Sequence, residues 1–101
     1  MTLDFHSIKD KKYLFRLEDS QIVLLSEIFQ IFRLRSGLYI DPYGDVKLSP
    51  ELQRLLLQII EEYVAATDLN TNKEKTSAIL EFKGLIRYFT AKKTDLLIVG
   101  D

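Results

Sequence analysis

The sequence predicts an α+β fold, in which about three helices pack on a small, mainly antiparallel sheet. Three observations carry this prediction. Apolar residues alternate with polar ones near the N-terminus, three central segments repeat apolar residues at helical spacing, and the C-terminal tail is continuously apolar. Alternation has the two-residue period of a strand, whereas recurrence every three or four residues is the period of a helix.

The N-terminal segment from Leu3 to Leu17 is predicted to form a β-hairpin. Leu3 and Phe5 alternate with polar residues, and the same alternation returns over residues 13–17. The charged run over residues 9–12 separates the two halves and supplies a polar turn. Both halves are therefore expected to join the sheet.

A first helix is predicted from about Gln21 to Arg35. Asp19 or Ser20 can cap its start, and Gly37 supplies a natural stop. Its apolar residues cover more of the helix than the usual single stripe. They are Ile22, Val23, Leu24, Leu25, Ile28, Phe29, Ile31, Phe32 and Leu34. Either this helix is central, between the sheet and the other helices, or a second chain covers part of it.

The segment from Leu38 to Leu48 is predicted to form a small central hairpin. Asp41, Pro42 and Gly44 compose an Asp-Pro-x-Gly turn between two short segments that are able to pair. Proline fits the second turn position, aspartate can accept a backbone hydrogen bond, and glycine tolerates a positive φ. The sheet is thus expected to combine N-terminal, central and C-terminal segments.

Two further helices have clear start signals. Ser49, followed by proline, predicts a helix that runs to about Ala66, because the serine side chain can accept a hydrogen bond from a free backbone amide. Thr71 and Glu74 have the spacing of a capping box and predict the start of a third helix that extends towards Lys92.

The tail over residues 95–100 predicts a strand that is buried on both faces or lies centrally in the sheet, because its apolar run is continuous. This strand could pair with the N-terminal ones. The sequence shows no internal repeat, low-complexity segment or linker. At 101 residues it has a common length for one domain, so residues 1–101 are predicted to be a single domain.

Composition narrows the classes of function. Lys+Arg number 14 and Asp+Glu number 15, so the net charge of -1 provides no bulk field that would attract nucleic acid or an anionic membrane. The chain has no cysteine, which excludes disulfides and thiolate chemistry and favours a cytoplasmic location. Its apolar stretches are well short of the roughly 20 residues that a membrane span needs.

No stretch carries a pattern typical of catalysis or of cofactor binding. His6 is the single histidine, which is a poor foundation for acid-base or metal chemistry. The glycine-rich phosphate motifs, the zinc-protease motif and the nucleophile elbow are absent. We therefore expect no enzyme activity, no metal and no cofactor. A small enzyme is an alternative only if His6 meets Asp41 or Asp95 in the fold.

The basic residues fall in small groups rather than in one run. These groups are Lys9, Lys11 and Lys12; Arg33 and Arg35; Lys73 and Lys75; and Lys92 and Lys93. Positive charge at the ends of the first and third predicted helices suits the helix dipole. A nucleic-acid-associated regulator is a further alternative, and it requires these groups to converge on one face.

Surplus apolar and aromatic residues, without a catalytic pattern, favour a protein-binding module. We expect a stoichiometric inhibitor, an immunity-type protein or an adaptor, and a homodimer is one form that it could take. Tyr39, Tyr43 and Asp45, presented by the central hairpin, are the predicted residues of the partner-binding surface. No stretch of the sequence is specific enough to indicate a family.

Overall fold

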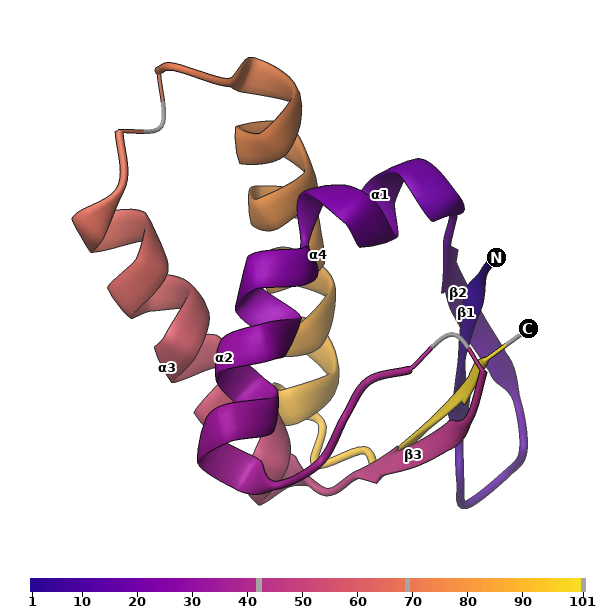
Figure 1. The fold of residues 1–101 in the computed structure, drawn as a ribbon. Coiled ribbons are helices and arrows are strands. Elements are labelled where there is room, and N and C mark those ends of the chain that lie inside the picture. Colours follow the sequence, from indigo (N-terminus) through magenta and orange to yellow (C-terminus); the bar gives the residue numbers. More distant parts are fainter. Residues whose placement is uncertain (42, 69, 101) are drawn as a thin grey trace.

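The computed structural model describes residues 1–41, 43–68 and 70–100, and these form an α+β fold (Figure 1). In chain order its elements are β1 (Leu3–Ser7), β2 (Tyr13–Leu17), α1 (Asp19–Leu24), α2 (Ser26–Ser36), β3 (Asp45–Leu48), α3 (Pro50–Ala66), α4 (Lys73–Ala91) and β4 (Leu96–Gly100). The strands form one antiparallel sheet in the order β2-β1-β4-β3, so the predicted fold class is confirmed. None of the described helices combines the length and apolarity that crossing a bilayer requires.

The N-terminal hairpin of β1 and β2 forms as predicted, but it contains a bulge. Phe5 pairs with Phe15, whereas the next residue of β1, His6, pairs with Tyr13, so Leu14 is an extra residue on β2. Plain alternation would place Tyr13 and Phe15 on one face of the sheet. The bulge instead turns Tyr13 to the opposite face, beside His6.

The C-terminal strand β4 lies centrally, between β1 and β3, as the apolar tail predicts. Leu96 and Ile98 are buried in the core that the sheet shares with the helices. Leu97 and Val99 point to the other face, where they are only half-buried. Figure 1 shows the helices gathered on one side of the sheet, which leaves this second face uncovered.

The predicted central hairpin is wrong. Of the described residues from 38 to 48, only those of β3 form a strand, and they pair with β4 rather than with residues 38–40. Ile40 is 1% exposed, so this segment is held by burial of a side chain and not by backbone pairing. The apolar tail supplies the pairing partner because β4 offers β3 a full-length, buried neighbour.

The turn before β3 does use the residues that the sequence indicates. Tyr43 donates its backbone N–H to Asp41 Oδ1, and Gly44 donates its N–H to the carbonyl of Asp41. Pro42, to which the prediction gave the second turn position, lies outside the described residues.

The predicted first helix is divided at Leu25, so the described chain has four helices rather than about three. Leu25 has φ −97° and ψ 2°, and its side chain is buried. α1 starts with a capping box between Glu18 and Gln21, not with a cap at Asp19 or Ser20. Because the axis changes at Leu25, apolar residues that would surround one straight helix now face a common core.

That core takes in the apolar residues Leu25, Ile28, Phe29 and Phe32. Of the apolar surplus predicted for this region, Val23 and Leu34 are left exposed, at 64% and 79%. α2 then ends at Gly37, which adopts the left-handed conformation (φ 77°) expected of a glycine stop.

The remaining helices confirm one start signal and correct the other. α3 begins as predicted, with Ser49 Oγ accepting a hydrogen bond from the N–H of Leu52. For α4 the predicted capping box of Thr71 is wrong by one residue, because Asn72 Oδ1 accepts from the N–H of Lys75. Asparagine is the stronger cap residue of the two, and the threonine hydroxyl instead donates to the carbonyl of Asp68.

Candidate functional site

The sheet face that no helix covers, here called the outer face, has an apolar centre. Leu97 and Val99 of β4 lie there, in a hollow of about 320 Å³. The hollow is lined by His6, Ser7, Ile8, Lys11, Lys47, Leu97 and Val99. Antiparallel sheets often leave one face to water, and that face is then mostly polar. Large aliphatic side chains at its centre are instead typical of a contact surface.

Strand register fixes the neighbours on the outer face. One row across the sheet contains Tyr13, His6, Leu97 and Lys47, and the next contains Arg16, Asp4, Val99 and Asp45. The rings of His6 and Tyr13 meet edge-on, with centroids 5.7 Å apart. Arg16 Nε donates to Asp4 Oδ1 at 2.6 Å, and this contact raises the pKa of Arg16. Aromatic, apolar and charged groups therefore lie side by side on one surface.

The rim of the hollow is basic. Lys11 and Lys47 line it, and no carboxylate of the described residues does. Asp10, in the turn between β1 and β2, lies next to Lys11, and a hydrogen bond from Ser7 lowers the pKa of its carboxyl, with a smaller contribution from Lys12. The hollow thus has an apolar floor edged by lysine, while Asp4 and Asp45 flank Val99 on the neighbouring row of the outer face.

The residues predicted for partner binding lie in or next to the loop between α2 and β3. Tyr43 is 77% exposed. Tyr39 is less exposed, and the guanidinium of Arg33 lies 4.6 Å from the centre of its ring. Asp45 is the first residue of β3, and the register places it on the outer face opposite Val99. A loop and a strand start present these residues, not a hairpin.

Sequence reasoning missed the centre of this surface. Leu97 and Val99 belong to a tail whose continuous apolar run predicts a strand buried on both faces or central in the sheet, and such a run does not show which residues face the core. The sequence does not place His6 on this surface either, because a single histidine suits an ordinary structural or surface role anywhere in the fold. Lys47 does indicate an exposed face of the sheet. A charged residue on a strand that pairs with the tail requires that face to be in contact with water.

The alternative of a catalytic site was tied to His6 meeting Asp41 or Asp95. Neither aspartate lines the hollow that His6 lines, and no hydrogen bond or ion pair among the described residues joins His6 to either of them. Across residues 1–41, 43–68 and 70–100, no three metal-ligating side chains gather as they would around an ion.

The basic groups on α4 do not converge. The helix has 19 residues, and at about 1.5 Å per residue its ends lie roughly 28 Å apart. Lys73 and Lys75 occupy one end, and Lys92 and Lys93 follow the other. Arg35 is engaged elsewhere, in an ion pair with Glu62 at 2.7 Å.

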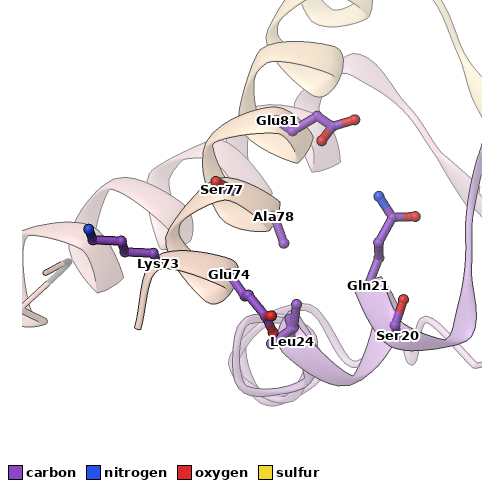
Figure 2. Close-up of a pocket in the computed structure, with 8 residues that line it drawn as sticks. All are labelled: Ser20, Gln21, Leu24, Lys73, Glu74, Ser77, Ala78 and Glu81. Carbon is purple, nitrogen blue, oxygen red and sulfur yellow. The ribbon is translucent and has the colours of Figure 1, made fainter. Parts of the chain in front are cut away.

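A second cleft, of about 560 Å³, lies between α1 and the first half of α4 (Figure 2). Its lining consists of Ser20, Gln21, Leu24, Lys73, Glu74, Ser77, Ala78 and Glu81. In Figure 2 Glu74 extends towards Leu24, whereas Lys73 points away from the cleft. The lining is polar and of mixed charge. It therefore offers less apolar area to a partner than the outer face does.

An electrostatic cluster of residues that line neither the hollow nor the cleft ties three helices together. Tyr63 of α3 donates its hydroxyl to Glu27 Oε2 of α2 at 2.8 Å, and Lys75 Nζ of α4 lies 3.3 Å from Glu27 Oε1. The hydrogen bond from Tyr63, and then that from Lys75, lower the pKa of Glu27.

This cluster should make stability depend on pH in the acid range. Because the pKa of Glu27 is lower in the folded than in the unfolded state, the gain is present above the unfolded pKa and is lost as the pH falls through the folded pKa. Glu27→Gln should therefore reduce the loss of unfolding free energy on acidification, measured by urea denaturation at a series of pH values. An unchanged pH profile in Glu27→Gln would contradict this. The effect is small because the site is exposed.

Comparison of the chain with family models, with curated proteins and with solved structures found no significant match.

Proposed function

We propose that this protein is a non-enzymatic protein-binding module, which acts by stoichiometric contact as an inhibitor, an immunity-type protein or an adaptor. The outer face of the sheet is its binding surface. The observation that carries the proposal is the position of Leu97 and Val99 at the centre of a face that no helix covers. Protein contact surfaces draw most of their affinity from such an apolar centre, within a polar rim.

The rim supports a polypeptide partner. Lys11 and Lys47 can steer an acidic partner and set its register, because rim charges act mainly on approach and specificity. Asp45 extends the same surface at the start of β3, and Tyr43, two residues before it, carries an exposed aromatic ring that offers rigid contact area. A second copy of this chain is one such partner.

Substituting the apolar centre should weaken binding of the partner. Val99→Thr combined with Leu97→Thr places a β-branched residue suited to a strand at both positions but puts hydroxyls where apolar groups would be desolvated. Affinity for a partner captured from a lysate of the source organism should fall about 10- to 100-fold, since about 1.4 kcal/mol corresponds to a factor of ten. Binding is measured by calorimetry with the purified partner.

The matched control is Val23→Thr, which makes the same exchange at an exposed position on α1. It should leave partner binding unchanged. Tyr43→Ala forms a second arm, with a smaller loss of affinity expected if the loop before β3 belongs to the contact. The proposal is overturned if the Val99 and Leu97 substitutions leave binding at the level of the Val23→Thr control while circular dichroism shows that all variants are folded.

A further inference from the structure

β3 is an edge strand with an unused hydrogen-bonding side. The sheet order gives it a neighbour only in β4. Gly100 donates its N–H to the carbonyl of Gly44, so these two residues form a hydrogen-bonded pair. Such pairs recur at every second residue of an antiparallel ladder, and the N–H and C=O of Asp45 and Lys47 therefore point away from β4. No backbone hydrogen bond among the described residues uses these groups.

The side chains of this edge carry opposite charges two residues apart. Asp45 and Lys47 flank Val46, and both are exposed on the outer face. Neither forms an ion pair with another described residue. Charged side chains on a short edge strand usually prevent pairing with another sheet. Here the opposite charges of Asp45 and Lys47 instead make the strand complementary to an antiparallel copy of itself.

We propose that β3 pairs antiparallel with β3 of a second copy, about a two-fold axis at Val46. In this register Asp45 faces the partner's Lys47, and Lys47 faces the partner's Asp45. Each outward backbone N–H and C=O of these residues then finds a complementary group across the axis. Opposite charges that face each other across strands stabilise the pairing. The two sheets become one, and their outer faces become continuous.

The charge pattern selects this register. A two-fold axis at Asp45 would place that carboxylate opposite the partner's Asp45, and an axis at Lys47 would place two ammonium groups opposite each other. Like charges directly opposite destabilise a strand pair. Only the axis at Val46 pairs unlike charges at both positions. This inference rests on the proposed function, because it names a second copy as one polypeptide partner and β3 as the contact.

Charge reversal tests the register. The dimer dissociation constant is measured by sedimentation equilibrium on the full chain. Asp45→Lys and Lys47→Asp should each raise that constant about tenfold or more, because each creates two like-charge pairs across the axis. The double variant D45K/K47D restores unlike pairs and should restore dimerisation. A wild-type chain that stays monomeric, single variants without effect, or a double variant that fails to recover would each overturn the proposal.

Cross-linking tests the position of the axis. The chain has no cysteine, so Val46→Cys introduces a single thiol. The two copies of residue 46 form a non-hydrogen-bonded pair, with Cα atoms about 4.5 Å apart, and this lies within the range that a disulfide bridges. Oxidised Val46→Cys should form a covalent dimer. Val23→Cys, at a more exposed position, is the matched control. Equal cross-linking of Val46→Cys and Val23→Cys would contradict the proposed position of the two-fold axis at Val46.

These outcomes are separate from those for the proposed function. If the Val99 and Leu97 substitutions weaken partner binding while the charge reversals leave the dimer dissociation constant unchanged, the proposed binding surface is supported. The proposed pairing of β3 with β3 of a second copy is then wrong. If the charge reversals change dimerisation as expected but the Val99 and Leu97 substitutions leave partner binding unchanged, the β3 dimer is supported. The proposal that the outer face binds the partner is then wrong.

Discussion

Phe82→Ala is expected to lower the unfolding free energy by about 4 kcal/mol, the middle of the range for removal of a buried aromatic ring. Phe82 of α4 is 1% exposed. Its ring meets Phe5 of β1 edge-on at 6.0 Å and Phe29 of α2 at 5.6 Å, so it joins the sheet to two helices. Truncation removes both contacts and leaves a cavity that neighbours on different elements cannot easily close.

This loss is a large share of the whole stability, which for a domain of this size is about 5–15 kcal/mol. The midpoint of thermal unfolding should fall by roughly 20 °C, at about 4–8 °C for each kcal/mol. Tyr88→Ala is the control, because Tyr88 is an exposed aromatic residue on the same helix. It should cost less than about 1 kcal/mol. Similar losses in the two variants would show that Phe82 does not fill the core.

Gln53→Leu should have the second largest effect, a loss of about 3 kcal/mol. Gln53 of α3 is fully buried. Its Nε2 donates to the carbonyls of Leu48 at 3.0 Å and Thr94 at 2.6 Å, and its Oε1 accepts from Thr90 Oγ1 at 2.9 Å. One side chain thus holds the end of β3, the approach to β4 and the last turn of α4. Leucine removes the donor that these two carbonyls share, and a buried carbonyl left without any donor costs about 1–3 kcal/mol.

Two further variants separate hydrogen bonding from packing at this position. Thr90→Val removes only the hydroxyl that Gln53 accepts from, and should cost about 1 kcal/mol. Gln53→Glu keeps the shape but, when ionised, sets a carboxylate against two carbonyls. Burial raises the pKa of such a carboxyl above its unfolded value, so the folded state binds more protons. The stability of Gln53→Glu should therefore increase as the pH falls through that raised pKa.

Denaturant unfolding of Gln53→Leu, Gln53→Glu and Thr90→Val at several pH values measures these differences. If Gln53→Leu is as stable as the wild type, apolar packing at this position compensates for the lost hydrogen bonds, and the prediction is wrong.

Part of the candidate surface could be predicted from the sequence. Tyr43 lies within a turn that its aspartate and glycine identify in the sequence, Asp45 follows that turn, and turn residues are normally exposed. Leu97 and Val99 could not be recognised, because the same apolar run serves a strand covered on one face or on two. The free edge of β3 could not be predicted either, since the residues of a strand do not determine which neighbouring strand it pairs with.

The sequence by itself determined the elements whose signals are local. Ser49 starts α3 and Gly37 ends α2, because one side-chain oxygen or one positive φ is enough to fix a helix end. The N-terminal hairpin follows for the same reason, from alternation on both sides of a short charged turn.

Only the tertiary structure decided where these elements pack. Leu25 divides one apolar segment into two helices because a shared core buries more of it than a straight axis could. β3 pairs with the distant β4 instead of with its chain neighbour, which leaves a free edge and an uncovered face. Both outcomes depend on apolar area contributed by residues far along the chain, and no local pattern contains that information.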